Sequence, residues 1–345
     1  MSPGFRYLSR KPGLLNCQLS AILYAPFGLP TVRKTISHLQ AQAEVAIELV
    51  LIQPEGSPYP EEDFAPLILR SVEVPNGLTT AQCWALGVKS AGAPIVVFTE
   101  DHCFPEPGWA KALVEAHREE RWYAVGPAAE NANDSTRISR ADMLMNFLDQ
   151  LTNPEGPAPA LMGHNTSYKK SVLETLSDEM LVSGLRCEIV LHQSWGPEHC
   201  LHLPGARVRH INLSKPLPFL LHKLFGGVVF GSERCARWSV PKRAVYLAGS
   251  WAIPALRLQR ILTRLTSLAP NRKTRLLSAW PWLIPALLLH ASGEALGYLL
   301  GPSASPAFYK FYCQFEQRRW DMVCENDRRI QHQVLSQKVT PPRGK

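Results

Sequence analysis

The chain has 345 residues, 46% of them hydrophobic, so it is long enough for one large domain with a substantial appendage. Its 37 Lys and Arg against 29 Asp and Glu give a net charge of +8, which favours an anionic partner such as a nucleotide diphosphate or an acidic membrane. No nucleic-acid partner is expected, because RRM, KH and HTH signatures are missing and aromatics do not alternate with the basic residues. The eight cysteines are scattered without a CxxC pair, which excludes a disulfide framework and favours a reducing compartment.

The first third of the chain alternates predicted strands with predicted helices. Short apolar runs bounded by turn residues predict strands, and apolar positions at helical spacing predict helices. Strands are predicted over 19–25, 46–52, 67–74 and 123–125, and helices over 31–43, 79–91 and 110–120. This alternation is typical of βαβ units with a mostly parallel sheet, so the fold class is α/β.

A further strand, within the stretch from Pro94 to Trp109, leads directly into candidate functional residues. The apolar run at 95–98 is typical of a strand buried on both faces. Glu100, Asp101 and His102 follow at its carboxyl end, which is where open α/β sheets bind ligands. Side chains alternate along a strand, so we expect Glu100 and His102 on one side and Asp101 on the other. A carboxylate and an imidazole on one side can hold a divalent cation.

This stretch, PIVVFTEDHCFPEPGW, resembles the metal-binding segment of family 2 glycosyltransferases with the GT-A fold. The family has Asp-x-Asp or Asp-Asp-Asp where this chain has Glu100, Asp101 and His102. Later stretches resemble family segments in the family's order, at 163–171 (GHNTSYKKS), 186–192 (RCEIVLH), 203–210 (LPGARVRH) and 293–301 (GEALGYLLG). The resemblance covers residues 18–301. It implies a GT-A-type nucleotide-binding domain with a mostly parallel central sheet, followed by a helical, membrane-associated C-terminal region.

The resemblance also implies an activity, which is transfer of a sugar from a nucleotide-diphosphate sugar to an acceptor with inversion. Glu100, His102 and His210 would hold a divalent metal, Mn²⁺ or Mg²⁺, on the donor diphosphate. Imidazole ligands favour Mn²⁺, because Mg²⁺ prefers oxygen ligands and retains its waters. The positions implied for the donor nucleotide are Pro26, Gln53, Glu55 and Asp101.

Inversion in one displacement needs a single base, and the resemblance makes Glu188 the candidate. Asp178 and Glu179 are nearby alternatives. The sugar and acceptor pocket would be lined by Gly163, His164 and Asn165.

The C-terminal third has a different composition. From 215 to 275 there are twelve Lys or Arg and one acid, Glu233. Between 254 and 268 the apolar and basic residues separate at helical spacing, with Leu258, Ile261, Leu262 and Leu265 on one face and Arg257, Arg260 and Arg264 on another. This pattern predicts a helix on an anionic membrane surface; the alternative is a helix packed on the catalytic domain with its arginines in water.

The next stretch, 276–293, contains no Asp, Glu, Lys or Arg over 18 residues. We favour a monotopic or re-entrant hairpin here, because Pro281, Pro285 and His290 interrupt it, and we keep a single span as the alternative. The expected division of the chain is a catalytic domain at 18–213, a membrane-associated region at 214–301, and a C-terminal helix with a basic tail at 302–345 that is disordered from Cys324 onward.

The sequence therefore predicts a glycosyltransferase on the cytoplasmic face of a membrane, with a glycan or lipid-linked acceptor. A non-catalytic relative that binds nucleotide sugars or acts as a scaffold is the main alternative. A nucleotidyltransferase ranks last, because residues 25–30 lack the cationic residue of a phosphate loop. A structural zinc site is also disfavoured, because no zinc-finger spacing fits the cluster Cys187, His192, His199, Cys200 and His202.

Overall fold

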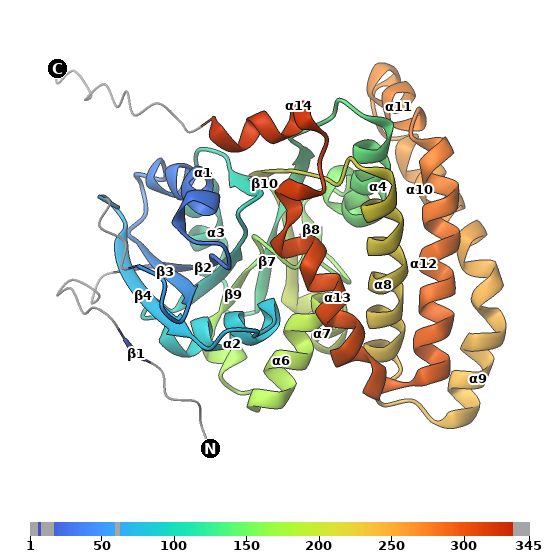
Figure 1. The fold of residues 1–345 in the computed structure, drawn as a ribbon, viewed down its shortest axis with the longest axis horizontal. Helices are drawn as coiled ribbons and strands as arrows, with labels where there is room; N and C mark the ends of the chain where they lie inside the picture. The colour runs from blue at the N-terminus through green and yellow to red at the C-terminus, as the bar shows by residue number, and fades with distance from the viewer. Residues whose placement is uncertain (1–5, 8–16, 59–62, 334–345) are drawn as a thin grey trace.

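The computed structural model describes residues 6–7, 17–58 and 63–333 (Figure 1). The rest, including the end of the predicted basic tail, lies outside the described residues. The strands are β1 (Arg6–Tyr7), β2 (Leu19–Tyr24), β3 (Ile47–Pro54), β4 (Ile68–Val74), β5 (Ile95–Thr99), β6 (Cys103–Pro105), β7 (Ala124–Asn131), β8 (Gly156–Pro157), β9 (Ser167–Lys169) and β10 (Cys200–His210). The helices up to β10 are α1 (Leu29–Gln40), α2 (Thr80–Ser90), α3 (Trp109–Ala116), α4 (Arg137–Thr152), α5 (Lys170–Leu173), α6 (Asp178–Arg186) and α7 (Glu188–Trp195).

One sheet organises the first two thirds of the chain, in the strand order β1-β4-β3-β2-β5-β9-β7-β10-β6 with β8 beside β10. β2 pairs in parallel with β3 and β5, β3 with β4, and β7 with β10. The short β9 runs antiparallel to both β5 and β7, so these two strands point the same way. The long strands are therefore parallel, and the predicted α/β class with a mostly parallel central sheet is confirmed.

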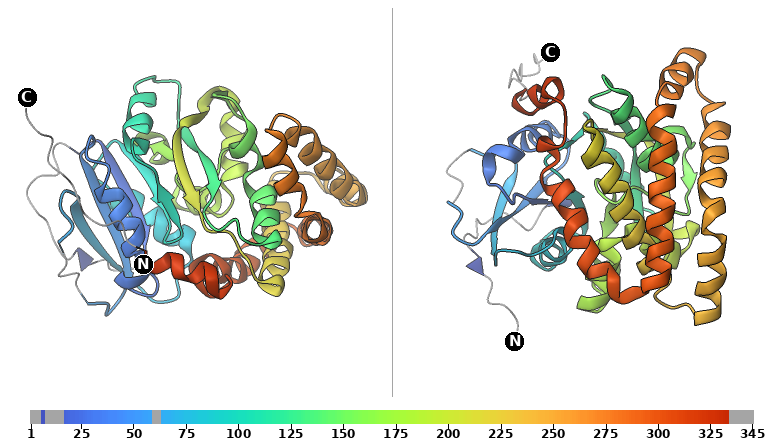
Figure 2. Two further views of the ribbon diagram at one scale, coloured as in Figure 1. Left: turned by 90° about the horizontal axis from the view of Figure 1, so that it is seen from above. Right: turned by 45° about the vertical axis from the view of Figure 1, so that its right-hand side comes forward.

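Helices cover both faces of the sheet (Figure 2). Leu19, Ala21 and Leu23 of β2 belong to the buried apolar cluster that includes α1 and α3. Ile22 of the same strand belongs to a second cluster, with α2 and α6. Because both faces are buried, these strands are apolar almost throughout, which is the pattern that reveals them in the sequence. The predicted strands and helices of the first third are confirmed, with small shifts at their ends.

The C-terminal region is helical: most of its helices pack against α4, at the end of the molecule away from β4, and the last of them lies near α1 (Figure 1). Its helices are α8 (Pro216–Arg234), α9 (Val240–Gly249), α10 (Ile253–Leu265), α11 (Pro270–Leu277), α12 (Trp280–Leu300), α13 (Ser305–Gln317) and α14 (Glu325–Arg328). α8 and α12 approach closely at glycines: a Cβ added at Gly293 would lie 2.1 Å from the Leu224 carbonyl oxygen, and one at Gly227 would lie 2.2 Å from that of His290. The two backbones are therefore in direct contact.

Two expectations about this region are wrong. The apolar face of α10 packs inside the protein, because Ile261 and Leu265 are buried against α4 and α12 with Leu258 partly buried beside them; only Leu262 of the predicted face is exposed. The uncharged stretch at 276–293 is also no hairpin, since residues 280–300 form one continuous helix. α12 is long and apolar enough to cross a membrane, and 44% of its most apolar window is buried within the protein.

The expected disorder from Cys324 is wrong for residues 324–333. Asp327 of α14 is buried and accepts hydrogen bonds from Asn133, Ser135 and Ser214. These contacts attach the C-terminal segment to the loops after β7 and β10.

Candidate active site

The predicted metal residues meet at the carboxyl edge of the sheet. Glu100 to His102 lie between the end of β5 and the start of β6, and His210 is the last residue of β10. β6 pairs antiparallel with β10, with Cys103 opposite His210, so the two segments are neighbours. The expected alternation along a strand is wrong, because β5 ends at Thr99 and the acids lie in a turn. Asp101 therefore stays on the same side as His102, and its Oδ1 lies 2.7 Å from His102 Nδ1.

Glu100 is the centre of a cluster of imidazoles. Its Oε2 lies 3.1 Å from His102 Nε2 and 3.3 Å from His164 Nδ1. The ring of His210 is 4.8 Å from that of His164 and 5.0 Å from that of His102, measured between centroids. The structure thus brings His164, which the resemblance assigns to the sugar pocket, beside the residues that it assigns to the metal.

Burial and the neighbouring charges shift the pKa values of the cluster in different directions. Burial would raise the pKa of the Glu100 carboxyl, but His164 and His102 hold it below its ordinary value. Burial would lower the pKa of His102, but Glu100 and Asp101 raise it well above its usual range. Burial lowers the pKa of His164 and, aided by His164 and His102, lowers that of His210 further. His164 and His210 are consequently neutral near pH 7, whereas His102 holds a proton that it would release when a metal ion binds.

The cluster fits a divalent cation. Glu100 Oε2 and the Nε2 atoms of His102, His164 and His210 are buried without a hydrogen-bond partner among the described residues. Two groups of three residues place their donor atoms within 4.8 Å of one another: Glu100, His164 and His210, and Glu100, His102 and Glu316. Both groups contain Glu100, but His102 belongs to one group and His210 to the other. A donor set of carboxylate and imidazole suits Mn²⁺ better than Mg²⁺.

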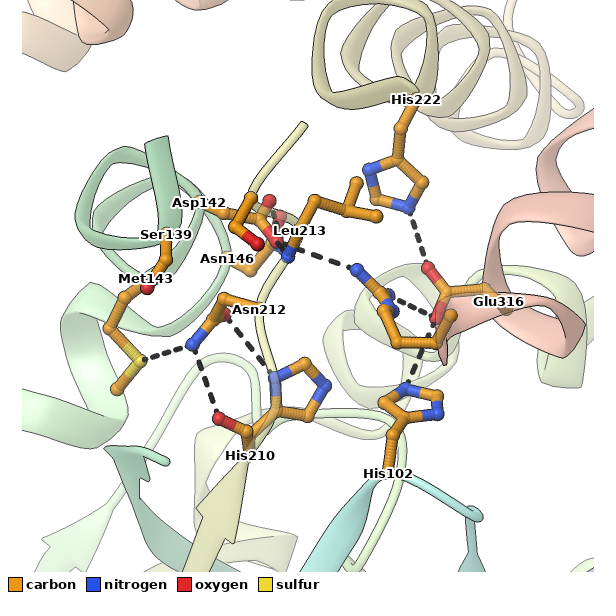
Figure 3. A network of polar contacts seen from close by, with 12 residues as sticks. His102, Ser139, Asp142, Met143, Asn146, His210, Asn212, Leu213, His222 and Glu316 are labelled. Atoms are coloured by element: carbon orange, nitrogen blue, oxygen red, sulfur yellow. Dashed lines mark hydrogen bonds and ion pairs between the residues drawn. The ribbon is translucent and has the colours of Figure 1, made fainter. Parts of the chain in front are cut away.

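Glu316, in the last turn of α13, is a residue that the sequence did not indicate. Its Oε1 lies 2.6 Å from His222 Nε2 of α8, and its Oε2 pairs with Arg319 and lies 3.6 Å from His102 Nε2. Figure 3 shows Glu316 between His222 and His102. The residues around Glu316 in the sequence do not distinguish it from an acid on the exposed face of a helix. Only the packing of α13 against α8 brings it to the site.

A cavity of about 420 Å³ opens beside the cluster and contains the predicted base. Glu100, Gly163, His164 and Glu188 all line it. Glu188 begins α7, and burial raises the pKa of its carboxyl to about 8. The alternatives Asp178 and Glu179 are exposed in the first turn of α6, where Asp178 pairs with Lys89 at 2.6 Å.

Helices of the C-terminal region build much of the opposite wall. These lining residues include His222, Lys223 and Phe230 of α8, Arg257 and Arg260 of α10, and His290 of α12. The cationic ones are paired within the protein: Lys223 lies 2.5 Å from Asp142, Arg257 lies 3.1 Å from Glu294, and Arg260 pairs with Asp149. The cavity is therefore shared between the sheet domain and the C-terminal helices.

The residues predicted for the donor nucleotide do not line this cavity. Pro26 follows the end of β2 and is half-buried, Gln53 is buried near the end of β3, and Glu55 is exposed in the turn beyond it. Asn165, predicted for the sugar, is buried with φ +57°, and its backbone N–H donates to the Phe98 carbonyl at 2.6 Å. Both polar atoms of its side chain are buried without a partner among the described residues.

The sequence matches no family profile, and no curated protein matches it. Solved structures do resemble the fold. A mannosyltransferase of Pyrobaculum calidifontis, solved with GDP-Man and Mn²⁺, is 15% identical with a TM-score of 0.49, over 83% of this chain and 89% of that one. GalNAc-T7, with UDP, GalNAc and Mn²⁺, is 13% identical with a TM-score of 0.39, over 57% and 43%.

A third is glucosyl-3-phosphoglycerate synthase of Mycobacterium tuberculosis, with Mn²⁺, UDP-glucose and phosphoglyceric acid, at 15% identity and a TM-score of 0.37, over 57% and 72%. The fold is thus similar to that of these three solved proteins.

Proposed function

We propose that the chain is an inverting glycosyltransferase that moves a sugar from a nucleotide-diphosphate sugar to an acceptor hydroxyl. One observation carries the proposal: Glu100 belongs to both candidate metal groups and also lines the cavity that contains Glu188. Sugar transfer needs a cation at the leaving diphosphate and a base at the acceptor, held in one place. The geometry of this site supports both.

In this proposal Glu100, His102 and His210 provide the metal site, with His164 beside them. The bound ion would act as a Lewis acid that neutralises the charge of the departing diphosphate. The Nε2 atoms of His164 and His210 support a bound ion, because buried polar atoms without a partner among the described residues are costly unless a ligand satisfies them. Mn²⁺ is the expected metal and Mg²⁺ the alternative.

Glu188 is proposed to accept the proton of the acceptor hydroxyl. A carboxyl with a pKa of about 8 is a stronger base than an exposed glutamate, and it is close to the operating pH that favours general-base catalysis. Gly163, His164 and Asn165 would contact the sugar and acceptor. Pro26, Gln53, Glu55 and Asp101 are proposed for the nucleotide, since they lie at the carboxyl ends of β2, β3 and β5.

The acceptor is proposed to be lipid-linked, and the protein to act at an anionic membrane surface on the cytoplasmic side. Residues 235–293 contain nine Lys or Arg and no Asp or Glu. The same helices expose large apolar side chains, with Trp251 84% and Trp280 66% accessible and Val245, Leu256 and Leu288 also exposed. Basic and aromatic side chains together favour the interface of an anionic bilayer. These residues replace the buried face of α10 as the proposed contact.

The proposal is tested by measuring the melting temperature with a panel of nucleotide sugars, with and without Mn²⁺, and then the release of nucleoside diphosphate. We expect one donor to stabilise the protein only with Mn²⁺ and to release its nucleoside diphosphate. Stabilisation without any release would favour the non-catalytic alternative, which the altered Glu100-Asp101-His102 triplet also favours. If no donor stabilises the protein, both functions are wrong.

A further inference from the structure

The inference concerns Glu316, the carboxylate that α13 brings to the metal cluster. Its Oε2 lies 3.6 Å from His102 Nε2, and its donor atom lies within 4.8 Å of those of Glu100 and His102. His102 is buried, and its Nε2 faces the carboxylates of both Glu100, at 3.1 Å, and Glu316. An acid from α13 and an imidazole from the β5–β6 turn thus approach each other at the wall of the cavity, which Glu316 lines.

The surroundings of Glu316 are those of a metal ligand. Ligating carboxylates are usually held by hydrogen bonds from an outer shell of residues. Here His222 contacts Oε1 at 2.6 Å, and the buried Arg319 pairs with Oε2. Each carboxylate oxygen has two lone pairs, so Oε2 can accept from Arg319 and still bind an ion.

Arg319, which contacts Glu316, is itself held by a buried acid. Asp142 of α4 is fully buried and lies 3.4 Å from Arg319 and 2.5 Å from Lys223. Lys223 also donates to Asn146 Oδ1 at 2.8 Å. Asp142 and Glu316 thus share Arg319, and this contact holds the guanidinium in place behind the Glu316 carboxylate.

We propose that Glu316, in place of His210, is a ligand of the site's divalent cation, together with Glu100 and His102. The inference rests on the proposed use of a metal, and it selects between the two donor groups. The group with Glu316 supplies two carboxylates to a buried dication, whereas Glu100, His164 and His210 supply one. A buried dication is held better by the set that neutralises it. His164 and His210 then line the donor side of the ion.

The first test is a titration of the full-length protein with Mn²⁺ alone, with free Mn²⁺ followed by its EPR signal. Glu316→Gln keeps the size of the side chain and removes its charge, so we expect Mn²⁺ affinity to fall at least roughly 10–100-fold, the loss seen even for outer-shell changes. Glu325→Gln, on the exposed part of α14, is the matched control and should bind like the wild type. A folded Glu316→Gln variant with unchanged affinity would overturn the inference.

The second test needs no variant, which covers the case in which Glu316→Gln does not fold. Pulsed EPR of Mn²⁺ bound to the wild-type protein counts directly coordinated histidine nitrogens. We expect one, from His102; two would mean that His210 coordinates the ion with His102 or His164, and would overturn the inference while leaving metal use intact. If the wild type binds no Mn²⁺ at all, the metal of the proposed function is wrong as well.

Discussion

Gly163 lies directly against the carboxylate of Glu188: a Cβ added at Gly163 would lie 2.6 Å from either carboxylate oxygen. Both residues line the cavity, so the space that the carboxylate occupies exists because residue 163 has no side chain. Position 163 therefore requires glycine, because any larger residue would take the space of the proposed base.

Gly163→Ala should displace the Glu188 carboxylate and lower kcat at least about tenfold, because a misplacement of about 1 Å is enough for losses of that order. The melting temperature should change little, since the atoms that must move are the end of a flexible side chain. Gly205→Ala is the control, because a Cβ there meets nothing within 4 Å. Wild-type kcat in Gly163→Ala would show that the position of this carboxylate does not limit transfer.

Glu188→Gln should keep donor binding and reduce transfer by about 10²–10⁴-fold. Only the ionised carboxylate is a base, so wild-type kcat should rise with pH and level off above the pKa of about 8. Glu179→Gln, on the exposed start of α6, should leave the rate and its pH profile unchanged. Full turnover by Glu188→Gln would move the role to another group.

The same raised pKa predicts how stability depends on pH. Between the ordinary glutamate value and about pH 8 the folded protein keeps a proton on Glu188 that the unfolded chain has lost. The contribution of Glu188 to the free energy of unfolding therefore falls as pH rises through this window. Glu188→Gln cannot lose a proton, so its stability relative to the wild type should increase from pH 5 to pH 8, measured by denaturant unfolding. A constant difference would mean that this carboxyl is not perturbed.

Changing both Glu100 and His102 to Ala should abolish the stabilisation that a nucleotide sugar gives in the presence of Mn²⁺, because one donor group then loses two members and the other loses Glu100. The measurement is the melting temperature with donor and Mn²⁺ against donor alone. Glu119→Gln, an exposed acid beside Arg121, is the control. Undiminished Mn²⁺-dependent stabilisation in the double variant would place the metal elsewhere.

Trp251→Ser with Trp280→Ser should weaken binding to lipid vesicles, since these rings are the most exposed aromatics of the proposed membrane contact. Arg264→Gln with Lys273→Gln should weaken binding to anionic vesicles and leave neutral ones nearly unchanged. Arg257 is unsuited to this test, because it pairs internally with Glu294. Leu217→Ser, exposed near the start of α8, is the control. A full-length protein that is monodisperse without detergent and ignores anionic vesicles would contradict the membrane proposal.

Local patterns in the sequence were sufficient for the strands and helices of the first third of the chain, but they did not indicate β6, β9 or α4. The run at 95–98 is buried on both faces, and Thr79 caps α2 through a capping box with Gln82, so each element follows from residues close to it in the chain. Glu100 and His102 could be placed at the carboxyl edge of the sheet because they follow a buried strand, whereas His210 was added only by the resemblance.

Contacts between distant segments could not be predicted in the same way. The spacing of Leu258, Ile261 and Leu265 indicates an apolar face, but the pattern is identical whether a bilayer or α4 and α12 cover it. Glu316 reaches His102 only through the packing of α13 on α8. Nothing in the sequence indicated that His164 Nδ1 lies 3.3 Å from Glu100 Oε2, because the two residues are far apart in the chain.

The contact between α8 and α12 has a consequence for how the protein can be altered. Gly227, Gly231, Gly293 and Gly297 leave no room between the backbones, and α8 and α12 both contribute to the cavity wall. A methyl group at any of these positions would force the helices apart by its own width and carry His222 and His290 with them. These glycines lie away from the metal cluster, yet they set the width of the chamber that an acceptor would have to enter, so variation there would act on the choice of acceptor.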